Sequence, residues 1–591
     1  MYEARRVLRQ AMVFCDQTAE VLMIRAIKLE EKTGNYKEAR ELLSRLELVD
    51  ITKVWRIALE GAMLESRCGN IVTARRVLRY LRKHVPWFGP IYFEAFRLEE
   101  KEENWLEAED IVEQGLTEIP KYGPLWMGAL RLAETMDSLE PDGGGLVRTR
   151  SVIERAAKNI SKEILWKIWL EAGACEHRYA KSLNPDDPAA LSRNLTRARK
   201  CLARAALTCP SNLTWRVWVS GALMEADAGQ EATARTLLRR AYATVPEKSR
   251  ASVFVEAANA EETLGNLDVA SAILTVARSE VSSDWKVWLE AVEFERRCSP
   301  NDSERARSLA RAAIEMHNST GRIWALVVAM ETDPEQQAEL LRRALENVPK
   351  SGEVWCEAAR VHLDPTSQAF DLGTVQRFLD FATQFTPQFG DSFLECLRLK
   401  LILEVKDKFC VALLERLREL VGASEFDVAP DRATLREQRG ALMEEIVSVC
   451  ASFARSLPMA GDDESVVQEL DGVDLADLVL RASNSEPNYG AHWLSFHRSG
   501  LGKGVRAVIR EAKRNLCREV AHQFVRYVAA VGRQEGVAML VRKEGNWDAS
   551  LECKDGESAG AAADETDSDF ARILEKRLRE CPPLPPALLN T

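Results

Sequence analysis

Glycine, proline and aromatic residues are scarce in this chain of 591 residues, which contains 31 Gly, 21 Pro and only 7% aromatic residues. Scarce glycine and proline exclude a collagen-like chain, and few aromatic residues disfavour a strand-rich fold. The 13 Cys form no C-x-x-C pair and no Cys/His group at zinc-ligand spacing, which disfavours a disulfide scaffold and predicts reduced thiols. No hydrophobic run approaches the ~20 residues that span a bilayer, and the first residues lack a secretory core. These absences predict a soluble intracellular protein.

The abundant residues favour helices. Hydrophobic residues make up 46% of the chain, and Leu, Ala, Glu and Arg are frequent, which predicts a mainly helical protein with ample core. The 80 Lys and Arg against 91 Asp and Glu leave a net charge of -11. A uniformly basic coat for nucleic acid is therefore disfavoured, although a local basic face stays open. The 14 Trp, against 9 Tyr, form an excess that calls for an explanation.

An internal repeat accounts for this excess. An aromatic residue stands seven positions before a Glu in Tyr92/Glu99, Trp169/Glu176, Trp218/Glu225, Phe254/Glu261, Trp288/Glu295 and Trp324/Glu331, and Met23/Glu30 has an aliphatic residue in that slot. A Gly often follows four positions after the Glu, at Gly34, Gly69, Gly229 and Gly265. A small residue, usually before Arg, comes next at Ala39, Ala74, Ala108, Ala234 and Ala270. A Pro then closes the unit at Pro86, Pro120, Pro210 and Pro246.

Each unit predicts a helical hairpin. Seven residues are about two turns, so the aromatic residue and the Glu lie on one face of a first helix, helix A. The Gly supplies the left-handed residue that ends helix A, and a second helix, helix B, begins near the Ala-Arg pair. The small Ala lets helix B approach the ring on helix A, and the Pro ends the unit. Because one hairpin buries little surface, neighbouring hairpins must stack.

This pattern resembles the half-a-TPR (HAT) repeat family. Its signature positions stand clearly in SNLTWRVWVSGALMEADAGQEATARTLLRRAYATVP and DWKVWLEAVEFERRCSPNDSERARSLARAAIEMH. The resemblance covers about residues 1–400 and returns at the segment from Pro487 to Trp493. It implies an all-α fold, a superhelical α-solenoid of stacked antiparallel hairpins. Ordinary tetratricopeptide (TPR) repeats are the alternative, but they lack the Trp-to-Glu pairing and keep a stricter period.

The aromatic residues of helix A are the predicted repeat core. They are Tyr92, Trp126, Trp169, Trp218, Phe254, Trp288, Trp324 and Trp355. Their fixed position in each unit favours packing over stacking on nucleic-acid bases. Three departures occur: Trp55 stands three positions before its expected slot, Trp126 is followed by Ala133 in place of Glu, and Trp355 by His362.

The repeats set the expected domain limits. The array covers 1–400, and its first unit is incomplete, because EARRVLRQAM reads as a helix B without its helix A; either truncation or an atypical cap accounts for this. An irregular helical segment or junction follows at 401–470, and repeat-like helices return at 471–548. Residues 549–570 are acidic and predicted to be disordered. A short helix with a Pro-rich tail is expected at 571–591.

No motif indicates catalysis or a cofactor. The segment Gly500–Gly504 lacks the Ser or Thr that a phosphate loop places after its lysine, Lys503. His492 and His497 have no further ligands nearby in the sequence, so no metal site is predicted. The recurring Glu residues are expected to cap the hairpins or to pair with an Arg of helix B. The sequence therefore predicts a protein that is not an enzyme, with no cofactor and no metal.

Two basic helices are candidates for contact with RNA phosphates. The first carries Lys503, Arg506, Arg510, Lys513 and Arg514, followed by Arg518. The second carries Arg75, Arg76, Arg79, Arg82, Lys83 and His84. For both helices the alternative is a solvated helix face without a ligand.

The resemblance implies a non-enzymatic scaffold of an RNA-processing assembly in the nucleus, nearest to the splicing factors that bridge the tri-snRNP of the spliceosome. Its partners would be protein subunits of that complex, bound through an extended helical-repeat surface, with RNA as a further candidate, no membrane and an undetermined oligomeric state. The alternative is a direct RNA-binding repeat protein in mRNA 3′-end processing, ribosome biogenesis or organellar RNA maturation, which would place it in an organelle or the cytoplasm.

Overall fold

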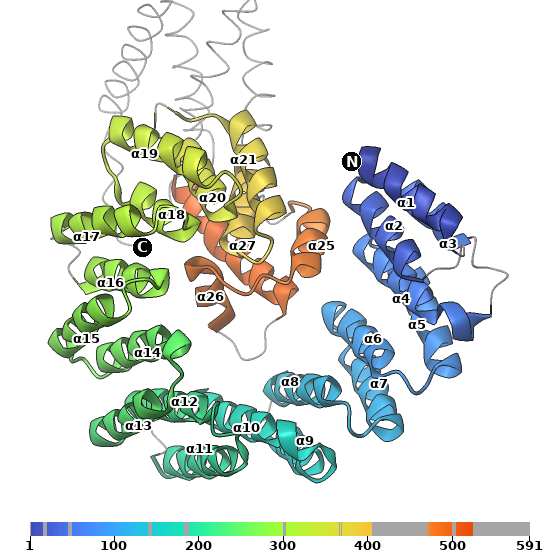
Figure 1. Ribbon diagram of the computed structural model, residues 1–591, viewed down its shortest axis with the longest axis horizontal. Helices are drawn as coiled ribbons and strands as arrows, with labels where there is room; N and C mark the ends of the chain where they lie inside the picture. The colour runs from blue at the N-terminus through green and yellow to red at the C-terminus, as the bar shows by residue number, and fades with distance from the viewer. Residues whose placement is uncertain are drawn as a thin grey trace, which may run out of the picture. The chain divides into compact units, whose positions relative to one another are not determined.

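The computed structural model describes residues 2–15, 20–44, 50–139, 145–182, 188–298, 303–365, 367, 369–404, 470, 472–498 and 504–523. Within these ranges the regular structure is helical, with no β-strand and one isolated bridge between Phe389 and Tyr489. The prediction of an all-α fold built from stacked helical hairpins is therefore confirmed (Figure 1). The chain divides into two compact units: unit 1 comprises Met1–Ile323 and His497–Arg506, and unit 2 comprises Trp324–Phe496 and Ala507–Thr591.

Unit 1 is a row of hairpins in which helices A lie along one side and helices B along the other (Figure 1). A first helix, α1 (Tyr2–Phe14), precedes them. The hairpins are α2 (Glu20–Lys32) with α3 (Tyr36–Ser44), α4 (Ile51–Arg67) with α5 (Ile71–His84), α6 (Gly89–Lys101) with α7 (Trp105–Glu118), α8 (Gly123–Leu139) with α9 (Val147–Asn159), α10 (Lys162–Ser182) with α11 (Pro188–Thr208), α12 (Thr214–Asp227) with α13 (Glu231–Thr244), α14 (Arg250–Thr263) with α15 (Leu267–Glu280), and α16 (Trp285–Cys298) with α17 (Ser303–Met316). A short 3-10 helix, η1 (Glu247–Ser249), leads into α14.

Local sequence signals place the helix ends. The glycines that follow helix A adopt a left-handed backbone, with φ of 75° at Gly34, 83° at Gly69, 71° at Gly229 and 82° at Gly265. This conformation turns the chain into helix B at little steric cost, because glycine has no Cβ. At the end of α6, Glu103 takes the same conformation, with φ of 60°. The predicted hairpin turn is thus present even where its glycine is missing.

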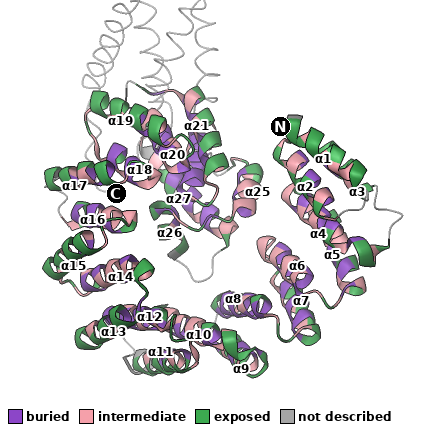
Figure 2. Ribbon diagram, viewed as in Figure 1, coloured by how far each residue is buried: buried purple, intermediate pink, exposed green. Residues whose placement is uncertain are grey.

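The apolar core extends along the repeats as a series of clusters. The largest buried cluster extends from Ala62 of α4 to Cys175 of α10, and smaller clusters continue through α16. The small residues at the start of helix B, Ala74, Ala108 and Ala234 among them, have no exposed surface. Figure 2 shows the buried residues on the sides where helices meet. Each hairpin is therefore covered by its neighbours, as the repeat predicts.

Unit 2 continues the hairpin pattern. Its helices are α18 (Gly321–Met330, whose first residues fall in unit 1) with α19 (Pro334–Asn347), α20 (Gly352–Leu363) with α21 (Leu372–Phe385), an unlabelled helix at 391–404, and then α25 (Ala476–Ser485), α26 (Ala491–Arg498) and α27 (Val505–His522). Asp333, Ser351 and Asp371 cap their helices by accepting hydrogen bonds from backbone N–H groups of the first turn.

The two inter-repeat loops at 386–390 and 486–490 lie side by side. Both loops have the order proline, side-chain amide, aromatic residue and glycine, in Pro387-Gln-Phe-Gly390 and in Pro487-Asn-Tyr-Gly490. The backbone N–H of Gly390 donates to the carbonyl of Tyr489 at 2.7 Å, and Gly390 lies so close to the ring of Trp493 that a Cβ would approach it to 2.2 Å. Only adjacent repeats bring such loops together, so α26 begins the repeat that follows the one starting at residue 391.

This adjacency makes 391–404 the helix A, and α25 the helix B, of one interrupted repeat. Arg481 of α25 donates to the Thr383 hydroxyl of α21 at 2.9 Å, so α25 lies beside the previous helix B. Pro387 and Pro487 are 100 residues apart in the sequence. If the 65 residues 405–469 are counted as an insertion, the remaining spacing between the two prolines is 35 residues. The uninterrupted spacings are similar, 34 residues from Pro86 to Pro120 and 36 from Pro210 to Pro246.

Several expectations fall outside the described residues. These are the content of 405–469, the acidic segment 549–570, the tail 571–591 and the side chain of Lys503. Among the described helices, none combines the length and the apolar run that crossing a bilayer requires.

Candidate interaction surface

Ion pairs with nearly buried carboxylates join several repeats to the next. In these pairs the Glu near the end of helix A accepts at least two hydrogen bonds, at 2.7–3.1 Å, from an Arg guanidinium of the preceding helix B. The pairs, called here the inter-repeat ion pairs, are Arg5–Glu30, Arg40–Glu65, Arg75–Glu99, Arg150–Glu176, Arg199–Glu225 and Arg235–Glu261. Their carboxylates are only 4–12% exposed. The Glu therefore pairs with an Arg of a helix B, which is one of its two expected roles, and this Arg belongs to the preceding repeat.

The same carboxylates also hold the turn that follows helix A. Asn266 donates its side-chain amide to Glu261 at 3.0 Å, and Asn104 donates to Glu99 at 2.9 Å. The hydrogen bond from Arg235, supported by Asn266, holds the pKa of Glu261 below its ordinary value. The carboxylate is therefore charged and satisfied at neutral pH, and it is not poised to exchange a proton.

The repeat of α8 departs from this scheme. Helix α7 carries Glu109 where the repeats that form inter-repeat ion pairs carry Arg, and Ala133 stands where Glu is expected. Glu134 instead receives two hydrogen bonds at 2.8 Å from Arg178 of α10. In the described part of the chain, one group could offer three metal ligands, Glu134, Glu171 and Cys175.

That group is occupied by an arginine. The Arg178 guanidinium donates to both Glu134 and Glu171 at 2.8 Å and lies 3.2 Å from the Cys175 sulfur. Burial raises the pKa of the Cys175 thiol well above its ordinary value, so the thiolate that a metal prefers is disfavoured. The cation that these side chains hold is the guanidinium, and the cluster is a structural ion pair between α8 and α10.

The eight predicted core aromatics fall into two groups. Tyr92, Trp126 and Trp324 are at most 1% exposed. The other five are half-buried: Trp169, Trp218, Phe254, Trp288 and Trp355. Arginines of neighbouring helices B cover several exposed ring faces; the guanidinium of Arg204 lies 4.6 Å from the Trp169 ring centre, and that of Arg240 lies 5.7 Å from Trp218. Five of the eight predicted core aromatics, Trp169 and Trp288 among them, are therefore only partly enclosed by the repeats.

Sequence reasoning missed a second aromatic position, three residues before the first. Trp166 and Trp215 occupy it and are 3% and 8% exposed, more buried than the Trp residues that follow them. Trp55 stands at this position too, which explains its offset from the expected slot. The W-x-x-W spacing of 166/169, 215/218 and 285/288 was the available signal, because residues three apart share a helix face.

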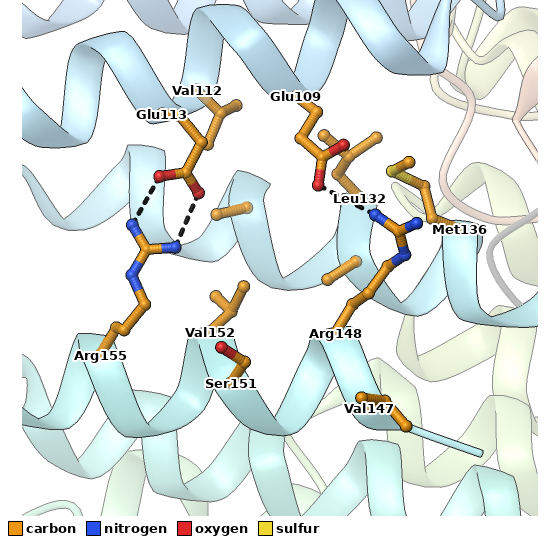
Figure 3. A pocket seen from close by; sticks show the side chains of 12 residues that line it. Glu109, Val112, Glu113, Leu132, Met136, Val147, Arg148, Ser151, Val152 and Arg155 are labelled. Carbon is orange, nitrogen blue, oxygen red and sulfur yellow. Dashed lines mark hydrogen bonds and ion pairs between the residues drawn. The ribbon is translucent and has the colours of Figure 1, made fainter. Parts of the chain in front are cut away.

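A pocket of about 290 Å³ opens between α7, α8 and α9. Figure 3 shows Glu109 and Glu113 of α7 facing Arg148 and Arg155 of α9 across it. Arg155 donates to Glu113 at 2.6 and 2.8 Å, and Arg148 to Glu109 at 3.1 Å. The floor is apolar and includes Ala129, Leu132, Ala133, Met136 and Val152. Such a pocket can take an apolar side chain while its charged walls contact polar neighbours of that side chain.

The basic candidates on α27 do not form one continuous exposed stripe. Arg510 and Arg514 are exposed, as is Arg518. Lys513 faces inward, is 8% exposed and donates to the carbonyl of Val473 at 3.5 Å, which corrects its predicted place on the stripe. Arg506 forms an ion pair with Glu102, at 2.6 Å. The helix period separates Lys513 from Arg510 and Arg514, and Lys503 lies outside the described residues.

Comparison with known proteins gives three likenesses. The sequence matches the family described as "PRP6, TPR-like domain" over residues 1–513. A TPR-containing protein of Dictyostelium discoideum is 42% identical over 415 residues, covering 70% of this chain and 30% of the relative, so the chain spans less than a third of that protein's length. The crystal structure of yeast Tom70 aligns with a TM-score of 0.24 at 11% identity, covering 63% of this chain and 93% of that chain, a superposition too loose to support an inference.

Proposed function

Since this chain belongs to the PRP6 TPR-like domain family, we propose that it is a non-enzymatic scaffold of a pre-mRNA splicing assembly in the nucleus. It would bind protein subunits through the surfaces of its stacked repeats. The observation that carries the proposal is the family match over residues 1–513, which takes in the repeat array of both units. Within that family resemblance, the tri-snRNP is the assembly that we propose.

The chemistry of the repeats supports a scaffold. Their buried charges, such as Glu99 with Arg75 and Glu176 with Arg150, are used to join one repeat to the next. The side chains of Glu134, Glu171 and Cys175 all contact the guanidinium of Arg178. These groups hold an extended row of hairpins in register, and such rows bind partners along their exposed faces.

We assign one partner contact to the pocket between α7, α8 and α9. Its apolar floor and paired charges suit an apolar anchor side chain flanked by polar groups, the usual composition of a binding hot spot. Ser151 is exposed at its rim, so a larger side chain there would fill the pocket without disturbing the core. Glu154, one turn further along α9, is exposed and does not line the pocket.

The test is purification of the tagged full chain from nuclei, with its bound RNAs identified. Co-purification of the tri-snRNP small nuclear RNAs is expected, and Ser151→Trp should reduce their recovery while the matched variant Glu154→Trp keeps it. Recovery of polyadenylation subunits, ribosome-precursor RNA or organellar transcripts in their place would contradict the assignment to splicing. Equal recovery with both variants would contradict the assignment of the pocket.

A further inference from the structure

Trp87 differs from the other tryptophans in the described part of the chain. Its side chain is 62% exposed, whereas the remaining described Trp residues are buried or half-buried in the repeats. It follows Pro86 in the loop between α5 and α6, outside the repeat positions that explain the Trp excess. Exposing a large apolar ring to water is unfavourable in free energy, so this ring is a candidate for contact with a ligand.

The loop itself does not need this ring. Val85 is fully buried, and the Phe88 ring packs on Trp55 with ring centres 4.2 Å apart, so the residues on both sides of Pro86-Trp87 anchor the loop. Six other loops place a residue directly after the closing proline. All six are exposed and polar: Lys121, Ser211, Glu247, Lys350, Gln388 and Asn488. The fold thus accepts a small or charged residue here, and packing does not account for tryptophan.

Helix α5 presents exposed cations near Trp87 in the sequence. The helix holds five Lys or Arg residues and no acidic residue. Two of the five are engaged, because Arg75 pairs with Glu99 and Arg82 donates to Gln114 at 2.9 Å. The exposed three are Arg76, Arg79 and Lys83. Arg79 reaches Glu107 only at 3.9 Å, and neither Arg76 nor Lys83 forms an ion pair with a described residue.

A second exposed ring lies among these cations. Tyr80 is 49% exposed and packs against His84, with ring centres 4.0 Å apart and ring planes tilted by 30°. Spacings of three and four residues place Arg76, Arg79, Tyr80 and Lys83 along one side of α5, and Trp87 follows within four residues of Lys83. These five residues are called here the α5 stripe. It runs over roughly 15 Å at the helical rise of about 1.5 Å per residue.

We propose that the α5 stripe binds single-stranded RNA. Arg76, Arg79 and Lys83 hold the phosphates, while Tyr80 and Trp87 stack on unpaired bases. Cations alone would also suit an acidic protein segment, but two exposed rings among them favour a ligand that offers both phosphates and free base faces. Helix α11 gives the contrast within this chain: Arg193, Arg197 and Lys200 are exposed there, with no exposed ring beside them.

The experiment measures binding of a fluorescein-labelled oligouridylate of about 15 nucleotides to the full chain by anisotropy, across a series of salt concentrations. Trp87→Ala should weaken binding by about tenfold and leave the salt dependence unchanged, because stacking releases no counterions. The triple variant Arg76→Ala/Arg79→Ala/Lys83→Ala should reduce the slope of log K against log salt by about 2. The matched control Arg193→Ala/Arg197→Ala/Lys200→Ala removes the same charge and should bind almost as tightly as the unaltered chain.

Three results would overturn the proposal. Equal affinity of Trp87→Ala and the unaltered chain would remove the stacking role, provided that circular dichroism shows both to be folded. If duplex RNA displaced the labelled oligouridylate as well as single-stranded RNA does, stacking on unpaired bases would not contribute to binding. Binding of polyglutamate that depends on the α5 stripe, without binding of RNA, would assign the stripe to an acidic protein partner. None of these results depends on which assembly co-purifies with the chain.

Discussion

Two regions of unit 1 use the same repeat but pack it differently. In α6 and α8 a glycine precedes the core aromatic by three residues, and Tyr92 and Trp126 are wholly buried. A Cβ on Gly89 would approach the Tyr122 ring to 2.6 Å, and one on Gly123 would approach Ile164 to 2.9 Å. The next repeat therefore fills the space directly beside the backbone.

In α10, α12 and α16 a tryptophan takes the place of that glycine. Two indoles then share the space, and Trp169, Trp218 and Trp288 remain half-buried beneath arginine side chains. Inter-repeat ion pairs occur in both regions: Arg75–Glu99 joins α5 to α6, although α7 has no arginine to pair with α8. Arg199–Glu225 joins α11 to α12, and Arg235–Glu261 joins α13 to α14, although Glu295 of α16 pairs with Arg305 of its own hairpin. The two regions therefore differ in how closely their core aromatic rings are enclosed: the rings are fully buried in α6 and α8, and they are half-buried in α10, α12 and α16.

The largest expected loss of stability follows removal of the buried Trp126 ring. Trp126→Ala should lower the free energy of unfolding by roughly 3–5 kcal/mol, because it empties a closed site. Trp288→Ala should cost only about 1–2 kcal/mol, since part of its ring is already in water. Denaturant unfolding followed by circular dichroism compares them. Equal losses would contradict the division into two kinds of packing.

Removal of an inter-repeat ion pair comes next. Arg199→Ala leaves the Glu225 carboxylate, which is 5% exposed, without its partner, while Arg199 itself is 44% exposed. The expected loss is about 1–2 kcal/mol, below that of a fully buried pair because solvent screens the arginine. Arg193→Ala on the same helix is the control and should change the unfolding free energy little. A loss as small as that of the control would show that the ion pairs do not hold this region.

The turn after helix A offers a smaller change of opposite sign. Glu103→Gly should stabilise α6–α7 by about 0.5–1 kcal/mol, because Glu103 holds a left-handed backbone that glycine adopts freely. Gly265→Ala should destabilise the protein by about 1 kcal/mol, because alanine is strained in the left-handed backbone that Gly265 adopts. No steric clash adds to this cost, since a Cβ at Gly265 would have no atom within 4 Å. Thermal unfolding of both variants measures these shifts. A lower midpoint for Glu103→Gly would contradict the argument.

Acid should gradually weaken the ion-paired junction between α13 and α14. Arg235 lowers the pKa of Glu261 below its ordinary value of 4.5. The stabilisation is therefore fully present above about pH 4.5 and is lost as the pH falls through the lower folded-state pKa. Hydrogen exchange of α13 and α14 amides at decreasing pH would follow this loss. The acid-dependent part should shrink in Glu261→Gln, and an unchanged dependence would assign it to other groups.

Much of the repeat was predictable because its signals are local. The Gly34 and Gly69 turns, the closing prolines and the A-to-B order depend on residues a few positions apart, and the structure has them as expected. Exposure was harder to predict: Trp126 and Trp288 occupy the same slot, yet one is buried and the other half-buried. That difference depends on whether glycine or tryptophan stands three residues earlier and on what the next repeat brings against it.

The sequence by itself determined the helices, their turns and their repeating order, since hydrophobic period, glycine and proline act within one hairpin. Only the tertiary structure decided which charges meet. It paired Glu176 with the arginine of the preceding repeat, turned Lys513 inward and left Trp87 in solvent. These outcomes depend on how separate hairpins stack, and a side chain's partner on another hairpin is not encoded in the residues beside it in the chain.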